Sequence, residues 1–162
     1  MRETQSPQEY FKTILLTVVG QAYDAAGYRL EEKPMQWSGG RFRFRKTLEN
    51  NLYAFIEYQL LAYVDTEWSS GVPSRFRVTL IRSDDPNGAR GTHADYVSRD
   101  LSALVVTDFD VPILPSNAHW WTYSTIDELG KALAESGHLV VGYGMPWLAG
   151  ELLPGEDSPS AD

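Results

Sequence analysis

The chain has 162 residues, of which 43% are hydrophobic and 22% charged, as in an ordinary globular domain and unlike disordered or collagen-like chains. The 22 acidic residues outnumber the 14 Lys and Arg, and the net charge of −8 argues against a dedicated nucleic-acid-binding protein. The absence of Cys excludes disulfides, a thiolate nucleophile and a finger-type zinc site. We expect one α+β domain over residues 1–153 and a disordered acidic tail over residues 154–162.

The N-terminus lacks the basic stretch and the apolar stretch that together make a secretory signal. The longest apolar runs are far shorter than the run of about 20 residues that spans a bilayer. We therefore expect a cytoplasmic protein without a membrane segment.

The first predicted element is a helix over residues 7–26. Ser6 and Glu9 have the spacing of a capping box, in which each side chain accepts a hydrogen bond from the other residue's backbone N–H. Pro7 stands at the first helical position, where its missing N–H costs nothing. Gly27 accepts the left-handed conformation that ends a helix.

After this helix the hydrophobic period changes to two, which is typical of strands. Alternation predicts strands over residues 41–45 and 75–81, and a long aromatic-rich run predicts another over residues 52–64. We further expect a strand over residues 101–107 and an edge strand over residues 28–33. Turn-forming residues separate these runs, so the predicted arrangement is an antiparallel meander.

The register of the first hairpin follows from its turn. A three-residue loop at residues 49–51 pairs Leu48 with Leu52, and this pairing places Arg43 opposite Glu57. One face of the hairpin is then apolar and the other charged. A slip by one residue would bury the arginines of one strand, so the register is strongly specified.

A second helix is predicted to begin at Thr125, which forms a capping box with Glu128, and to fray near Gly142. Gly130 and Gly137 lie inside it and indicate a bend or a close backbone contact. The order helix, strands, helix predicts an α+β two-layer sandwich, with both helices on one face of a four- to five-stranded antiparallel meander.

Four short motifs resemble a bacterial family of small domains of unknown function. They are Ala26-Gly27-Tyr28, Ile56-Glu57-Tyr58-Gln59, Trp120-Trp121-Thr122-Tyr123 and Gly144-Met145-Pro146-Trp147. The resemblance extends over residues 7–150 and implies the same order of elements. It implies no activity, cofactor or catalytic residue.

The most informative candidate site is the outward face of the predicted sheet. Its polar and aromatic residues are Arg41, Arg43, Arg45, Tyr53, Glu57, Gln59, Arg75 and Arg77. One interpretation is a solvated face with weak cross-strand pairs. The other is a platform that binds a small anionic ligand or an acidic protein partner, because the planar guanidinium holds a carboxylate or phosphate through two hydrogen bonds. Phe55, on the same face, adds stacking area in this second interpretation.

Two tryptophans, Trp37 and Trp68, stand beside Ser- and Gly-rich stretches and are expected to make exposed contacts or to line the rim of a pocket. Trp120 or Trp121, by contrast, is expected to cap the end of the core. Aromatic side chains with a polar group are enriched where proteins bind partners.

The sequence contains no specific catalytic or metal-binding motif. His93 with Asp95 has the composition of a carboxylate-oriented general base, although an exposed loop is the simpler interpretation. His119 is expected to cap or pack at the entrance to the second helix, and Asp108 with Asp110 lacks a third ligand. We expect no metal and no cofactor.

The leading hypothesis is a non-catalytic binding or regulatory module that docks a protein partner or an anionic ligand on the Arg-rich face. The alternative is a small-ligand-binding protein or an unrecognised hydrolase with a pocket between sheet and helices. RNA binding on the same face is disfavoured by the overall acidity. That acidity is uneven, since residues 41–99 hold 9 basic and 7 acidic groups and residues 100–162 hold 1 and 10.

Overall fold

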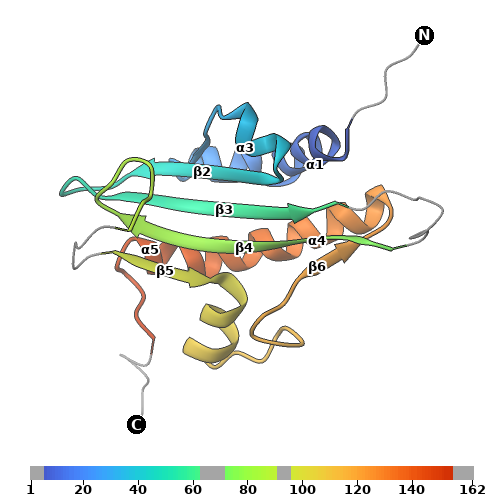
Figure 1. Ribbon diagram of the computed structural model, residues 1–162. Coiled ribbons are helices and arrows are strands. Elements are labelled where there is room, and N and C mark those ends of the chain that lie inside the picture. Colours follow the sequence, from blue (N-terminus) through green and yellow to red (C-terminus); the bar gives the residue numbers. More distant parts are fainter. Residues whose placement is uncertain (1–5, 63–71, 91–95, 155–162) are drawn as a thin grey trace.

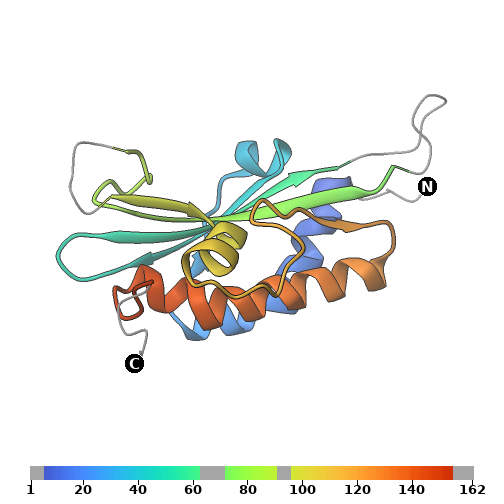
Figure 2. The ribbon, with the colours of Figure 1, turned by 90° about the horizontal axis from the view of Figure 1, so that it is seen from below.

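The computed structural model describes residues 6–62, 72–90 and 96–154. It is an α+β structure in which helices cover one face of an antiparallel sheet, as the sequence predicts (Figures 1 and 2). The sheet has six strands, whereas the sequence predicts four or five. The acidic tail is predicted for residues that lie, except for Pro154, outside the described part of the chain. Among the helices of the described residues, none combines the length and the hydropathy of a membrane span.

The helical elements fall into three groups along the chain. The first group is α1 (Pro7–Leu15), the π-helical segment η1 (Leu16–Gly20), α2 (Gln21–Ala25) and α3 (Pro34–Ser38). A second π-helical segment, η2 (Ala103–Asp108), stands alone. The last group is α4 (Ile126–Leu139), the π-helical segment η3 (Val140–Gly144) and α5 (Met145–Leu148).

The strands form one sheet in the order β1-β2-β3-β4-β5, and β6 also pairs with β4. Their bounds are β1 (Arg29–Leu30), β2 (Arg41–Thr47), β3 (Tyr53–Leu61), β4 (Ser74–Ser83), β5 (Val97–Asp100) and β6 (Trp121–Tyr123). The predicted edge strand is therefore present but only two residues long.

The predicted hairpin register is confirmed. Arg43 pairs with Glu57, and Leu48 donates its backbone N–H to the Leu52 carbonyl at 2.7 Å. Asn50 and Asn51 both have positive φ, which Asn tolerates better than most residues. The tight turn therefore sets which residues of β2 and β3 face the core.

The N-terminal helix keeps one face in the core through a π-helical turn. Ser6 and Glu9 form the predicted capping box, and Gly27 ends the helix at φ +95°. The buried residues of this helix recur every four positions, at Phe11, Leu15, Val19 and Tyr23. An ideal α-helix rotates about 40° too far in four residues to keep such a row aligned. The wider turn of η1 lowers the rotation and returns Val19 and Tyr23 to the core.

The predicted strand over residues 101–107 is wrong, because this segment is helical. The Asp100 carboxylate accepts hydrogen bonds from the backbone N–H groups of Ser102 and Ala103, at 2.9 and 3.3 Å, and so begins a helical turn. Leu104 and Val105 are buried within the turn. A short apolar run is compatible with a buried helix as well as with a strand. Here the segment is a helix because its apolar residues pack beneath the sheet.

The outer edge of β4 is shared by two short strands. β5 pairs with residues 79–82 of β4 and β6 with residues 74–76, so the segment between β5 and β6 interrupts a single line of pairing. The backbone N–H of His119 donates to Ser102 Oγ at 2.9 Å and joins the two ends of this interruption.

The C-terminal helix begins at the predicted capping box of Thr125 and Glu128. It continues through η3 and α5 to Leu148, beyond the predicted fraying near Gly142. Gly137 does mark a close contact, since a Cβ there would lie 2.9 Å from Val19 Cγ1. Gly130 marks none, because a Cβ there would meet nothing within 4 Å.

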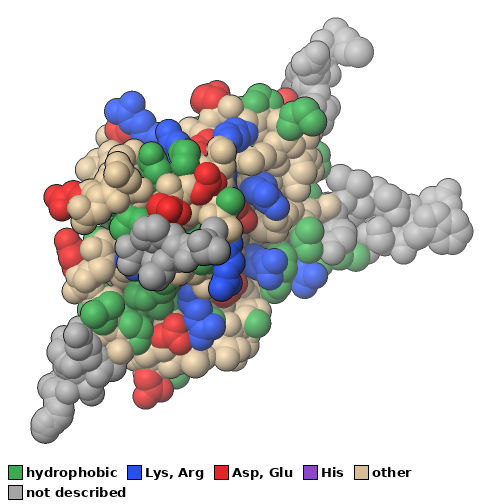
Figure 3. Space-filling model, turned by 60° about the vertical axis from the view of Figure 1, so that its left-hand side comes forward, with side chains coloured by type: hydrophobic (Ala, Val, Ile, Leu, Met, Phe, Trp, Pro, Cys, Tyr) green, Lys and Arg blue, Asp and Glu red, His purple; other side chains and the backbone are tan. Residues whose placement is uncertain are grey.

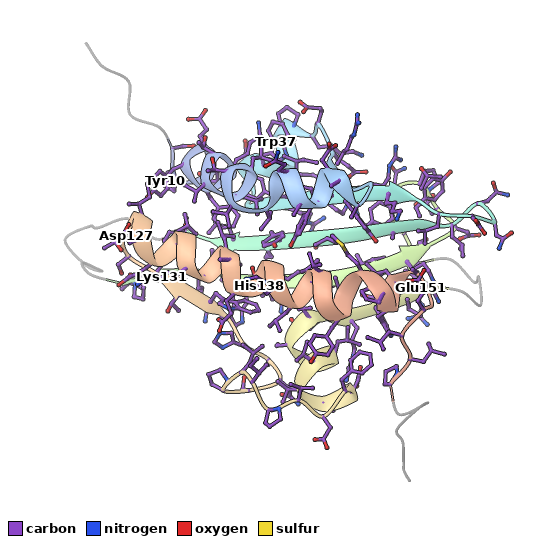
Figure 4. The ribbon with its side chains drawn as sticks, turned by 180° about the vertical axis from the view of Figure 1, so that it is seen from behind. Tyr10, Trp37, Asp127, Lys131, His138 and Glu151 are labelled. Carbon is purple, nitrogen blue, oxygen red and sulfur yellow. The ribbon has the colours of Figure 1, made fainter. Side chains whose placement is uncertain are left out.

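Buried aromatic rings fill the space between the sheet and its helices. The ring of Phe11 lies 5.2 Å from that of Phe42 and 5.4 Å from that of Phe76. The hydroxyl oxygens of Tyr23 and Tyr58 lie 2.7 Å apart in the same interior. Figure 4 shows α1 and α4 side by side over this layer, on one face of the sheet.

Candidate functional site

The outer face is the side of β2, β3 and β4 turned away from α1 and α4. In one row across the sheet Arg41 is opposite Gln59, which is opposite Arg77. In the next row Arg43 is opposite Glu57. The five predicted arginines therefore do share a face, and Figure 3 shows a band of Lys and Arg side chains on this side of the molecule.

A loop covers one half of the outer face. The segment after β4 folds back, and the backbone at Gly88 lies so close that a Cβ there would be 3.0 Å from an Nη atom of Arg43. The Asp85 carboxylate holds this loop by accepting hydrogen bonds from the N–H groups of Asn87 and Ala89. Phe55, expected to be exposed stacking area, is fully buried beneath it.

Arg43 is a buried and neutralised cation. It is only 7% exposed, its Nε lies 3.1 Å from the Glu31 carboxylate, and an Nη atom lies 3.9 Å from that of Glu57. Its guanidinium also lies 4.6 Å from the centre of the Phe55 ring. Arg43, Glu31 and Glu57 thus form an internal charge network, and Arg43 presents no free guanidinium to a ligand.

Arg45 belongs to the same covered half. It donates to the carbonyl of Pro86 at 3.3 Å, and its Nε lies 3.9 Å from the Glu31 carboxylate. Its guanidinium lies 5.6 Å from the centre of the Tyr53 ring. Arg45 therefore holds the loop over the sheet, and Tyr53 packs against Arg45.

The other half of the outer face is open among the described residues and carries three arginines, of which Arg41 and Arg77 are exposed. Arg75 and Arg77 lie with their guanidinium carbons 4.5 and 4.9 Å from the centre of the Trp120 ring. Within the described part of the chain, neither has a carboxylate within 4 Å, and the buried Nε of Arg75 has no hydrogen-bond partner. We call the open half the open cluster; it consists of Arg41, Gln59, Arg75, Arg77 and Trp120.

Arg41 is the third cation of the open cluster. Its only carboxylate contact among the described residues is Glu57, at 3.8 Å, and about half of its side chain is exposed. Glu57 lies nearly as close to Arg43, so this one carboxylate is divided between two cations. The open cluster therefore has an excess of positive charge.

Trp120 is the member of the open cluster that the sequence did not predict as a binding residue. Trp121 and Tyr123 of β6 face the core, so Trp120 alternates with them and points to the outer face. The alternation of residues 120–123 could have predicted that Trp120 lies on the face opposite to Trp121 and Tyr123. Trp121 does cap the core, as expected, and its indole N–H donates to Glu135 at 2.7 Å.

Of the two tryptophans beside Ser- and Gly-rich stretches, the structure describes only Trp37, which lies in α3. Trp37 is half-buried beneath the Lys12 ammonium, which lies 3.8 Å from the ring centre. It lines a hollow of about 570 Å³ between the start of α1 and α3, at the edge of the helical layer in Figure 4. Trp68 lies outside the described residues, as do His93 and Asp95.

His119 packs at the entrance to β6 and α4, with its ring centre 4.7 Å from that of Trp121. Burial lowers the pKa of His119, and the nearby carboxylates of Glu135 and Asp100 oppose this shift. Asp108 is engaged by two hydrogen bonds of 2.8 Å from Arg99. The described residues contain no cluster of three His, Asp or Glu side chains that could hold a metal ion.

Known proteins offer no assignment for this geometry. No family model matches the chain, and neither curated proteins nor solved structures show a significant similarity to it. This agrees with a resemblance to an uncharacterised family, which brings no site residues to the chain. The candidate site is therefore defined by its own contacts and charges.

Proposed function

We propose that this protein is a cytoplasmic, non-catalytic binding module whose open cluster binds an acidic segment of a protein partner. The observation that carries the proposal is the contrast between the two halves of the outer face. Arg43 is paired with carboxylates of its own chain, whereas Arg75 and Arg77 have stacking contacts but no counter-charge among the described residues.

The stacking geometry supports carboxylate binding. A guanidinium that lies on an aromatic ring uses its face, so the N–H groups along its edges stay available for hydrogen bonds. Carboxylates accept two parallel hydrogen bonds from such an edge. Trp120 thus orients Arg75 and Arg77 through their faces and uses none of their N–H groups. The Nε of Arg75 is buried, so a ligand would bind this residue through its Nη groups.

The charge distribution favours an acidic protein over a nucleic acid. The whole chain carries −8, which would repel the long phosphate backbone of a nucleic acid outside the open cluster. A short acidic segment interacts mainly with the cluster itself, because screening at physiological salt limits the range of charges to about 8 Å. Binding is therefore expected to weaken as salt is added.

The alternative of a ligand pocket between sheet and helices has no comparable support. The rings of Phe11, Phe42 and Phe76 occupy that space and are fully buried. The hollow beside Trp37 is at the surface, with polar and charged residues such as Glu9 and Lys12 in its wall.

The test is fluorescence anisotropy with a labelled peptide rich in Glu and Ser. We expect saturable binding that falls at least 10-fold in Arg77→Ala. Arg29→Ala is the matched control. Arg29 is 83% exposed on β1, so its substitution removes the same charge at a position outside the open cluster. We expect the control to bind within about 2-fold of wild type.

Two results would overturn the proposed function. The first is no binding of the acidic peptide, or an equal loss in Arg77→Ala and Arg29→Ala. The second is tighter binding of a single-stranded RNA of equal charge that depends on Arg77, which would replace the protein partner with a nucleic acid.

A further inference from the structure

The spacing of the two stacked guanidinium groups carries information about the ligand. Arg75 and Arg77 are two residues apart on one face of β4, so their Cα atoms are separated by about 6.7 Å. Continuing the pairing of Arg75 with Thr122 places Trp120 opposite Arg77. One aromatic ring therefore contacts both guanidinium groups, whose Cα atoms are separated by the period of the strand.

Resting on the proposed function, we propose that the acidic segment binds in an extended conformation, with carboxylates at alternate positions. In an extended chain, side chains two residues apart point the same way and are about 6.7 Å apart, which equals the separation of Arg75 and Arg77 along β4. Each carboxylate then meets one guanidinium edge. The ligand motif is Asp or Glu, any residue, Asp or Glu.

A helical acidic segment does not match this arrangement. Residues two apart on a helix point in nearly opposite directions, and the neighbours on one helix face are three or four residues apart. The pattern required of a helical ligand is thus different from that of an extended one. The spacing of the acidic residues in a peptide therefore distinguishes an extended ligand from a helical one.

Trp120 is the positioning residue of this selectivity. The buried Nε of Arg75 has no hydrogen bond within the described residues, so contacts with Trp120 are what the structure shows holding this guanidinium. Without the ring, each Arg gains rotameric freedom and the separation of the two guanidinium groups is no longer set. Trp120→Ala is therefore expected to weaken the preference for alternate carboxylates more than the charge attraction itself.

The experiment compares two end-blocked peptides of identical composition and charge, built around Ser-Glu-Ser-Glu-Ser and Ser-Glu-Ser-Ser-Glu. Wild-type protein is expected to bind the alternate peptide at least 5-fold more tightly. Trp120→Ala is expected to bind both peptides equally, and Trp120→Tyr to restore most of the preference because its ring still stacks. Circular dichroism and thermal unfolding of each variant show whether it is folded.

The outcomes separate this inference from the proposed function. Equal binding of the two peptides by wild type, with both lost in Arg77→Ala, overturns the extended motif and leaves the acidic-segment function standing. Binding of neither peptide overturns the function itself. A preference that survives in folded Trp120→Ala overturns the positioning role of Trp120.

Discussion

The Nε atom of Arg43 lies 3.1 Å from a carboxylate oxygen of Glu31, and both side chains are less than a tenth exposed. This pair links β2 to the segment after β1 beneath the Gly88 loop. Arg43 on the outer face is thus held by carboxylates of its own chain, whereas Arg75 and Arg77 on the same face have no carboxylate within 4 Å among the described residues. Stability and binding should therefore respond to different arginines.

Arg43→Ala is expected to destabilise the fold by about 3 kcal/mol, because it removes the close partner of the buried Glu31 carboxylate and leaves it only Arg45, at 3.9 Å. Urea unfolding measures this loss. The double variant Arg43→Leu with Glu31→Leu should lose less than Arg43→Ala alone, since no buried charge is stranded. Arg77→Ala should change the free energy of unfolding by less than about 0.5 kcal/mol. A large loss in Arg77→Ala with none in Arg43→Ala would contradict this division of roles.

Tyr23→Phe and Tyr58→Phe are each expected to cost about 1–3 kcal/mol, because each leaves the other buried hydroxyl short of a partner. The double variant should cost less than the sum of the two. A thermodynamic cycle from chemical denaturation gives the coupling energy. Additive losses would show that the 2.7 Å contact contributes nothing to stability.

Alkaline pH is expected to destabilise the protein through its buried tyrosines. Burial raises the pKa of Tyr58 to about 12, and burial likewise raises that of Tyr123 to about 12, against an ordinary value of about 10. Between these two values the folded state keeps its protons and the unfolded state loses them. The contribution of these two tyrosines to stability is thus constant below pH 10 and falls above it, by about 1.4 kcal/mol per pH unit for each group.

Unfolding experiments across this pH range measure the slope, and Tyr58→Phe is the comparison because it removes one of the titrating groups. Its slope should be smaller than that of wild type. A slope that is unchanged by the substitution would assign the alkaline loss to other groups, such as lysines, whose ordinary pKa of about 10.4 lies in the same range.

Two glycines of α4 form a matched pair for testing the packing of the helical layer. Gly137→Ala should destabilise, because its Cβ would lie 2.9 Å from Val19 Cγ1 across the helix interface. Gly130→Ala should stabilise by about 1 kcal/mol, because its Cβ meets nothing within 4 Å and Ala favours the helix. Thermal unfolding of the two variants compares them directly, and shifts of the same sign would refute the packing argument.

Local patterns predicted those parts of the fold in which neighbours in sequence supply the partners. The capping boxes at Ser6 and Thr125 and the pairing of Arg43 with Glu57 depend on residues a short distance away along the chain. The prediction of a strand over residues 101–107 was wrong, because this segment is helical. Its apolar run fits a strand or a buried helix equally, and the choice depends on the packing that it finds beneath the sheet.

The sequence predicted that the arginines of the candidate site share one face of the sheet. It did not predict which other residues contact each of them. Alternation in β2 and β4 was enough to place the arginines together. The burial of Phe55 depends on a loop that returns from beyond β4, and the stacking of Arg77 depends on Trp120, which directly precedes β6. Such contacts join positions far apart in sequence, where no local pattern carries a signal.

By itself, the sequence determined the elements with local signals and the identity of the arginines on the outer face, because periodicity and turn chemistry act between near neighbours. Only the tertiary structure decided which of these arginines are neutralised. Arg43 meets Glu31 beneath a loop, whereas Arg77 contacts an aromatic ring and has no carboxylate within 4 Å among the described residues. Burial and charge pairing are properties of the assembled sheet, because they depend on contacts between residues that are far apart in the sequence.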